Sequence, residues 1–389
     1  VTLLSSFGTL VGIGGSIWLS MCLGQKNEKR ASQILYNSFV MLVVLSICLT
    51  LGFILLKHNL IYWFGGSDAL YPYANTYLTI YTLGTFFALM SIGLNYFITG
   101  QGYATIAMLS VCIGAITNIM FDFILIRTLK IGVAGAAIGT VVAQFISCMF
   151  VLCFLRFKSK IKLHKEELSI EKMKHIVKLG FSPFLIIASD SIILIVMNMM
   201  LQKYGGDMGD IYISAITVAQ SYFLLITGPL LGISSGTQPI FAYHFGSQNL
   251  KKIKEAFKIV ISFSFLFCLV MFIISMCYSN VFVAMFTNDA MTMPIADRAI
   301  KIFCLGILMM SIQYVLVDGI TGLSNVKLSL FLSLNRKLMY LCCTCLLPAF
   351  LGVSNIFYAQ PTADIYASIV TIICFIKIIP SYLKSHGVN

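Results

Sequence analysis

One carboxylate and one amide, Asp122 and Asn118, lie inside a long apolar run of the sequence, residues 104–126. A charged side chain at the centre of a membrane helix costs about 2.5–3.5 kcal/mol on insertion scales, so acids at such positions mostly bind or relay something. Residues four apart share one face of a helix, and Ser110 and Gly114 extend this stripe toward the start of the run. The spacing therefore predicts a small, polar helix face that points into a cavity and carries an ion-coupling site.

The composition of the chain is that of a membrane protein. Of its 389 residues, 59% are hydrophobic and only 10% are charged, whereas a soluble domain carries about 25% charged residues. Apolar runs long enough to cross a bilayer as helices recur along the sequence. The alternating polarity of membrane β-barrel strands is absent from the sequence. We therefore expect an all-α polytopic membrane protein.

The charged and reactive residues do not form an enzyme motif. The net charge is +12, but the basic residues cluster in short loops, which is typical of membrane topology signals and not of nucleic-acid binding. The 12 cysteines lie in apolar runs, and the sequence has no Walker loop, nucleophile elbow or HExxH motif. We therefore expect no enzyme, no catalytic residue, no metal, no cofactor and no nucleic-acid partner.

Eleven apolar ranges divide the chain into two halves. The expected spans are 2–23, 32–63, 74–99, 104–126, 133–155, 176–201, 211–243, 256–286, 296–320, 328–350 and 363–383. One long polar stretch, 156–178, is rich in lysine and is predicted to be a linker. The halves are then an N-terminal lobe over residues 1–155, with helices 2–6, and a C-terminal lobe over residues 179–389, with helices 7–12.

Loop charge predicts the orientation in the membrane. Lys26, Lys29 and Arg30 mark the first of several basic loops, which fall on the same side as the linker and Lys384. Cytoplasmic loops carry the excess of Lys and Arg, so we expect the linker and the C-terminus in the cytoplasm, in the plasma membrane of a bacterial cell. The opposite side is expected to hold the acids Asp210, Asp289, Asp297 and Asp364.

The two halves of the sequence repeat each other at a constant offset of 222 residues. Matched pairs are Gly14 with Gly236, Gly24 with Gly246, Pro72 with Pro294, Gly84 with Gly306 and Gly100 with Gly322. Regular matches at one offset indicate an internal structural repeat. The span 176–201 has no counterpart in the first half, so we expect a first helix, within roughly 45 residues before Val1, to be absent from this sequence. The intact fold would then have twelve helices in two six-helix bundles, related by an axis along the membrane normal.

These features resemble the multidrug and toxic compound extrusion (MATE) transporters. The pattern Asn118-x-x-x-Asp122, followed by GVAGAAIGT at 132–140, is similar to the family signature across its fifth and sixth helices. The segment QPIFAYHFG at 238–246 resembles the MepA-like branch. The resemblance implies a twelve-helix fold whose first helix is not in this chain, with eleven spans present.

The resemblance also implies a coupling site in the N-terminal lobe. In proton-coupled members it contains an Asn on the fourth helix and an Asn and an Asp on the fifth, which match Asn95, Asn118 and Asp122. A first-helix Asp of the family has no match here, and the coupling ion is H⁺ or Na⁺. The alternative is a purely structural hydrogen-bond cluster, worth under about 2 kcal/mol per bond. Against this alternative, the repeat places Val317, Tyr340 and Thr344 at the matched positions.

Four further charged residues lie within apolar runs of the second half. Asp190 and Asp318 are candidates for a substrate cavity that attracts cations, and the alternative is an acid that faces water or caps a helix. Arg336 and Lys337 are expected to snorkel to the cytoplasmic face, with an ion pair between Arg336 and a second-half Asp as the alternative.

The sequence thus predicts a secondary active exporter that works by alternating access. Its expected partners are small drug-like molecules, amphipathic and often cationic, together with membrane lipid, and it is expected to be a monomer. Aromatic and Met side chains are abundant enough to form an adaptable apolar cavity. The alternative is a flippase for lipids or lipid-linked saccharides, which would need a strongly cationic cavity.

Overall fold

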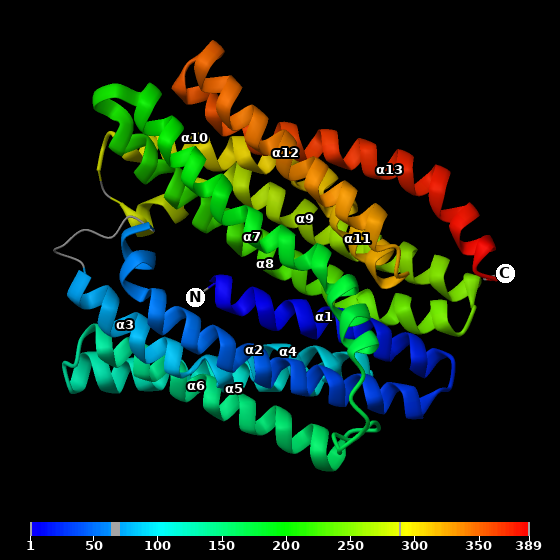
Figure 1. Ribbon diagram of the computed structural model, residues 1–389. Helices are drawn as coiled ribbons and strands as arrows, with labels where there is room; N and C mark the ends of the chain where they lie inside the picture. Colours follow the sequence, from blue (N-terminus) through cyan, green and yellow to red (C-terminus); the bar gives the residue numbers. More distant parts are fainter. Residues whose placement is uncertain (1, 64–70, 288, 388–389) are drawn as a thin grey trace. The chain divides into compact units, whose positions relative to one another are not determined.

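The computed structural model describes residues 2–63, 71–287 and 289–387, and within these residues it contains helices and no strand (Figure 1). The α-helices are α1 Thr2–Gly24, α2 Glu28–Trp63, α3 Tyr71–Leu83, α4 Thr85–Gly100, α5 Ala104–Asp122, α6 Val133–Cys153, α7 Ile170–Gly205, α8 Gly209–Gly246, α9 Leu250–Phe286, α10 Thr292–Phe303, α11 Ile307–Gly322, α12 Val326–Leu351 and α13 Ala359–Ser385. Short 3₁₀ or π segments are η1 Phe123–Thr128, η2 Phe154–Lys158, η3 Gly206–Met208, η4 Cys304–Gly306 and η5 Val353–Tyr358.

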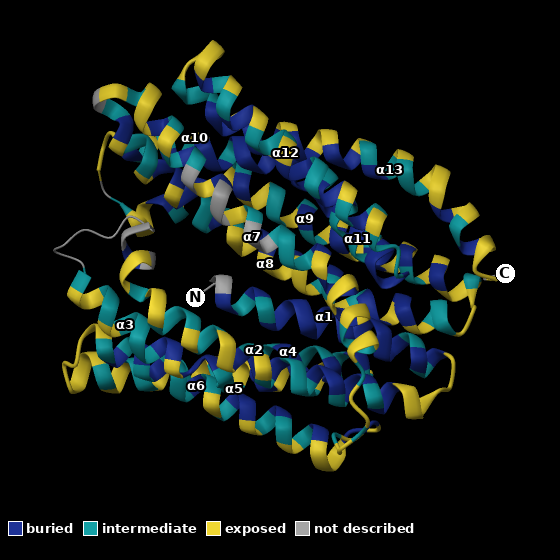
Figure 2. Ribbon diagram, in the orientation of Figure 1, coloured by how far each residue is buried: buried dark blue, intermediate teal, exposed yellow. Residues whose placement is uncertain are grey.

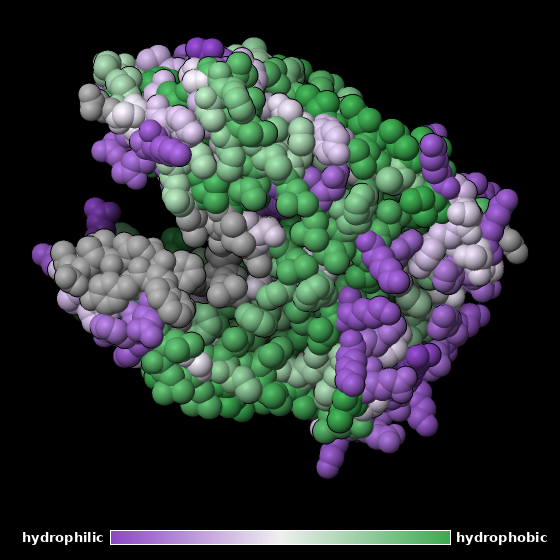
Figure 3. All heavy atoms as spheres, turned by 45° about the horizontal axis from the view of Figure 1, so that its top comes forward, coloured by the Kyte–Doolittle hydropathy of each residue, from purple (hydrophilic) through white to green (hydrophobic). Residues whose placement is uncertain are grey.

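Helices occupy all eleven ranges that were predicted to span a membrane. Nine helical segments among the described residues are long and apolar enough to do so, and the bent pair α3–α4 makes a tenth. α7, in the remaining range, is 36 residues long. Hydrophobic residues cover much of the surface visible in Figure 3, and hydrophilic residues gather in separate groups. The prediction of an all-α polytopic membrane fold is confirmed.

The helices form two compact units, residues 1–184 and 185–389. In the first unit, α1 is buried along most of its length (Figure 2). Its glycines allow close approach of neighbouring helices: a Cβ at Gly12 would lie 2.8 Å from the carbonyl oxygen of Gly93 on α4. Gly14 meets the first half of α7 at Gly180 in the same way. The glycine-rich run of α1 therefore serves helix packing.

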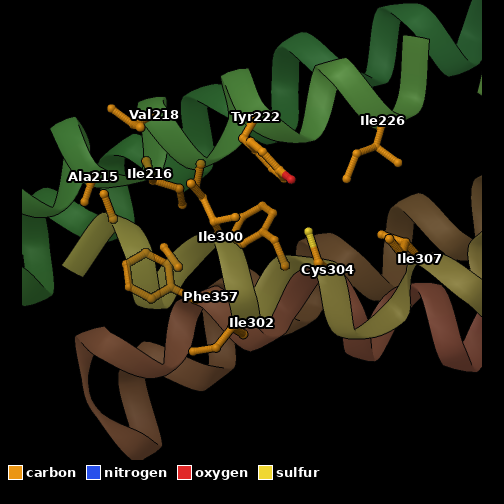
Figure 4. Close-up of a cluster of buried hydrophobic side chains, with 14 of the residues drawn as sticks. Ala215, Ile216, Val218, Tyr222, Ile226, Ile300, Ile302, Cys304, Ile307 and Phe357 are labelled. Carbon is orange, nitrogen blue, oxygen red and sulfur yellow. The ribbon is translucent and has the colours of Figure 1, made fainter. Parts of the chain in front are cut away.

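The second unit is held by an apolar cluster between α8 and α10 (Figure 4). Tyr222 and Ile226 of α8 face Ile300 of α10 and Cys304 of η4, and all four side chains are buried. The hydroxyl of Tyr222 accepts a hydrogen bond of 3.0 Å from Ser275 of α9, so its polar end is satisfied within the core.

The sequence repeat is present in the turns of both units. Lys26 and Gln248, which the offset of 222 pairs, have positive φ angles of 59° and 55°. Asn27 and Asn249 follow them, and each side chain accepts a backbone N–H from three residues later at 3.0 Å. An Asn in this position caps the next helix. The matched residues therefore end and restart the helices by the same local geometry.

Both units also break a predicted single span at the matched glycines Gly84 and Gly306. α3 and α4 meet at Gly84 with a bend of 55°, and η4 ends at Gly306 between α10 and α11. A Cβ at Gly84 would lie 2.5 Å from the side chain of Val141, and one at Gly306 would lie 2.9 Å from the Cα of Pro361. Each glycine thus admits a neighbouring helix at the break.

Candidate functional site

A cavity of about 400 Å³ lies between α4, α5 and α6 of the first unit. Its lining combines the small or polar residues Ser91, Asn95, Ser110, Gly114, Asn118, Thr140, Gln144 and Ser147 with Ile92, Tyr96, Val111, Ala115 and Ala143. Three of these residues, Ser110, Gly114 and Asn118, belong to the polar stripe predicted on α5. That stripe does face a cavity. Residues of α5 that do not line the cavity, such as Ile116 and Ile119, are more than half exposed.

Asp122 is the last residue of α5, one helical turn beyond Asn118. The amide nitrogen of Asn118 donates to Asp122 Oδ1 at 3.5 Å and to the hydroxyl of Thr140 on α6, also at 3.5 Å. Asn118 therefore connects the cavity wall to the carboxylate. Past Asp122 the helix widens into the π segment η1, a distortion that is frequent at functional sites.

Small residues on α6 make room for the polar groups of α5. A Cβ at Gly139 would lie 2.5 Å from Asp122 Oδ1, so only the absence of a side chain lets the carboxylate lie there. About two helical turns further on, Ser147 contacts Gly114, and its hydroxyl donates to the carbonyl of Ser110 at 2.9 Å. Close α5–α6 packing of this kind is typical of small-residue interfaces in membranes.

Asn95 of α4 lies on the same cavity. Its amide nitrogen donates to the carbonyl of Ala107 on α5 at 3.0 Å, which ties the two helices together. The structure therefore brings Asn95 and Asn118 to one cavity and places Asp122 next to Asn118, as the sequence pattern predicted.

Asp318 of α11 is held by two donors from α8. Ser234 donates to one carboxylate oxygen at 2.5 Å, and the amide of Gln238 donates to the other at 2.8 Å. The carboxylate therefore links α8 and α11 within the second unit. It has no ion-pair partner among the described residues.

The expectation that Arg336 and Lys337 snorkel to the membrane surface is wrong. Both side chains are buried, and each forms an ion pair. Lys337 pairs with Asp190 of α7, whose own side chain is 59% exposed. Arg336 pairs with Asp364 of α13 at 3.0 Å. Burial without a partner would be costly, so pairing explains why two adjacent cations are tolerated inside α12.

The sequence prediction placed Asp364 at the non-cytoplasmic surface, at the start of the span 363–383, and this placement is wrong. Asp364 is fully buried in α13, where Gln360 donates to its second carboxylate oxygen at 2.8 Å. The guanidinium of Arg336 makes a further hydrogen bond of 3.1 Å to the hydroxyl of Tyr314. A signal was present in the sequence: Gln360 and Asp364 are four apart and share a helix face, while Arg336 lacks a partner in its own helix.

The two units differ at positions that the repeat matches. The offset of 222 pairs Gly114 with Arg336 and Asn118 with Tyr340. In the first unit, Gly114 and Asn118 line the cavity. In the second unit, the matched positions carry the large side chains of Tyr340 and of Arg336, which forms the ion pair with Asp364. The polar cavity is therefore a property of the first unit's own residues and not of the shared helix packing.

The MatE family model matches residues 1–124 and 187–342 of the chain. Among curated proteins, the multidrug export protein MepA of Staphylococcus haemolyticus is 27% identical over 322 residues, which cover 80% of this chain and 68% of that protein. MepA of Staphylococcus aureus is 22% identical over 370 residues, which cover 93% of this chain and 80% of that protein.

Solved structures share the fold. A MOP superfamily transporter from Pyrococcus furiosus superposes with a TM-score of 0.92 at 21% identity, over 98% of this chain and 86% of that one. An outward-facing multidrug resistance MATE family transporter gives the same TM-score and identity, over 99% of this chain and 86% of the other.

Proposed function

The chain belongs to the MatE family, and from this premise we propose that it is a secondary active multidrug exporter that works by alternating access. Its cargo would be amphipathic, often cationic compounds, exchanged against protons or sodium ions. Similarity to the multidrug export protein MepA supports this choice. The observation that carries it is the cavity on α4–α6, whose polar wall leads through Asn118 to the carboxylate of Asp122.

Asp122 is the proposed coupling group, with Asn118 and Asn95 as its supporting amides. A carboxylate on a membrane helix can carry a proton or bind a cation, and its demand for hydrogen bonds changes when it does so. When Asp122 is ionised, the amide N–H of Asn118 is attracted to Oδ1. When Asp122 is neutralised, that attraction weakens and Asn118 is free to bond Thr140 alone.

This exchange offers a simple link between ion and drug. Asn118 lines the cavity and also touches Asp122, so a change in its hydrogen bonding alters the cavity wall where a drug would lie. Ion binding and drug binding then compete through one shared side chain. A cavity that prefers drug in one state and ion in the other is what antiport requires.

The chemistry of the cavity favours export of cations or neutral compounds over flipping of phosphate-bearing lipids. None of the residues that line it is Lys or Arg, and the lining residue Asn118 is hydrogen-bonded to the acid Asp122. A flippase for lipid-linked saccharides would need cations to hold the phosphate. Asp190 and Asp318 are weaker substrate candidates, because the first pairs with Lys337 and the second is bonded to α8.

A multi-pass protein whose basic loops fall on one side would lie in the plasma membrane with that side, its linker and its C-terminus in the cytoplasm. We propose that it acts as a monomer, because each proposed functional group lies within one chain.

Reconstitution tests the proposal. The purified protein is reconstituted into vesicles, and the vesicles are loaded with ethidium. Ethidium efflux is then followed in two separate experiments, one with a pH gradient and one with a sodium gradient. We expect efflux with at least one gradient and none when both are collapsed. Efflux driven only by ATP, or transport of a lipid-linked saccharide without ethidium transport, would contradict it.

A further inference from the structure

A second, strongly basic cavity of about 340 Å³ lies in the first unit, between the end of α1, the start of α2 and the start of α7. Trp18 of α1 is its buried floor, 6% exposed. Its other lining residues are Arg30, Ser169, Glu171, Lys172, Lys174, His175 and Lys178. Four full cations thus surround the cavity against one carboxylate.

Ion pairs within the described part of the chain do not neutralise the positive charge of this cavity. Among the described residues, no carboxylate lies at ion-pair distance from Arg30, Lys174 or Lys178. Lys172 donates to the neutral amide of Gln33 at 2.6 Å. The first turn of α7 adds the positive end of a 36-residue helix. Such a cavity attracts an anion with several oxygen acceptors.

The walls of the cavity are fixed in place by the protein. The guanidinium of Arg30 lies 5.1 Å from the centroid of the Trp18 ring, and the ring of His175, which also lines the cavity, lies 4.4 Å from the same indole. The fully buried Asn37 of α2 accepts the N–H of Ser169 at 2.9 Å and so anchors the residue that precedes α7. A preformed cavity of this kind loses little entropy when a ligand binds.

Apolar residues continue from the basic rim along α7. Val177 and Phe181 are 37% and 41% exposed, and their spacing from Lys174 and Lys178 puts all four on neighbouring faces of the helix. A ligand whose charged end enters the cavity could therefore lay an apolar part against Val177 and Phe181. A free inorganic anion has no apolar part that could pack against these two side chains.

We propose that this cavity binds the phosphodiester headgroup of an anionic phospholipid, with Lys174 and Lys178 at the phosphate and the acyl chains along α7. Basic pockets between membrane helices on the cytoplasmic side suit such headgroups, and the basic loops assign this end of the helices to the cytoplasm. The site is separate from the cavity on α4–α6, so its test does not depend on the transport proposal.

The two tryptophans of the chain make the binding measurable. In a Trp63→Phe protein, Trp18 is the single indole, and its emission reports directly on the floor of the cavity. The protein in neutral detergent is titrated with short-chain phosphatidylglycerol, with the matching phosphatidylcholine and with inorganic phosphate. The test variant is Lys174→Gln/Lys178→Gln, and the control with the same charge change is Lys251→Gln/Lys254→Gln on exposed positions of α9.

We expect saturable binding of phosphatidylglycerol that is about 30-fold weaker in the test variant and unchanged in the control, with equal melting temperatures. Equal binding of phosphatidylcholine, or the same affinity in the test variant, would overturn the proposal. Inorganic phosphate that acts over the same concentration range as the lipid would also overturn it, because the site would then serve a soluble anion.

Discussion

Gly139 of α6 and Asp122 of α5 fit together so closely that a Cβ at position 139 would lie 2.5 Å from Asp122 Oδ1. The contact sets where the carboxylate lies, and with it the hydrogen bond from Asn118. The carboxylate is the free end of a side chain, so it can rotate away when the glycine is replaced. A side chain introduced at position 139 therefore moves the carboxylate of Asp122 without changing its chemistry.

We predict that Gly139→Ala lowers export by at least about tenfold, because a functional group must be held to within about 0.5 Å of its working position. The measurement is ethidium efflux normalised to the amount of protein in the membrane. Gly52→Ala on α2 is the matched control, since no atom lies within 4 Å of a Cβ built there. Equal efflux from both variants would show that the position of Asp122 is unimportant.

The contact between Gly114 and Ser147 gives a second prediction, about the cavity itself. Gly114→Ala should force Ser147 aside and narrow the cavity, which lowers export of bulky compounds. Ser147→Ala removes the hydroxyl that causes the clash, so the double variant Gly114→Ala/Ser147→Ala should recover activity. We expect a coupling energy of at least about 1 kcal/mol in this double-mutant cycle. Additive effects would contradict the packing account.

Unequal burial of Lys337 and Asp190 predicts unequal effects on stability. The side chain of Lys337 is 10% exposed and that of Asp190 is 59% exposed. Asp190→Asn leaves a buried ammonium without a counter-charge, so it should lower the melting temperature in detergent more than Lys337→Met does. The double variant should be more stable than Asp190→Asn alone. The reverse order for the two single variants would contradict this reading.

The buried pair Arg336–Asp364 should matter more than an exposed one. Removing one partner of a buried ion pair costs about 3–5 kcal/mol, since the other charge stays buried and unpaired. Asp364→Asn should therefore greatly reduce thermal stability. Glu255→Gln, which breaks the exposed pair with Lys252, is the control and should leave the melting temperature unchanged. A similar loss in both variants would argue against the special role of burial.

Most of the fold follows from the sequence, because apolar length alone identifies membrane helices. All eleven ranges contain helices, and the offset of 222 correctly pairs residues such as Asn27 and Asn249, whose caps depend only on local chemistry. The bend at Gly84 and the 3₁₀ segment that ends at Gly306 could not be predicted, since each depends on the helix that packs against the glycine.

The first-unit site was predictable for a similar reason. Asn118 and Asp122 lie on one helix at a spacing that fixes their common face. In contrast, Arg336 and Asp364 are 28 residues apart on different helices, and Lys337 and Asp190 are 147 apart. Which of several acids meets which cation depends on helix packing, so the spacing of Gln360 and Asp364 indicates a shared helix face but does not identify Arg336 as the partner. The sequence analysis therefore did not predict that Asp364 is buried in an ion pair with Arg336.

The central claim is that Asp122 couples an ion gradient to drug export. It is tested most directly by ethidium transport into inverted membrane vesicles, energised by a pH gradient, for wild type, Asp122→Asn and the exposed-acid control Asp210→Asn. The account predicts transport by wild type and the control, and loss of gradient-driven transport in Asp122→Asn although the protein still binds ethidium. Wild-type transport by Asp122→Asn would contradict it.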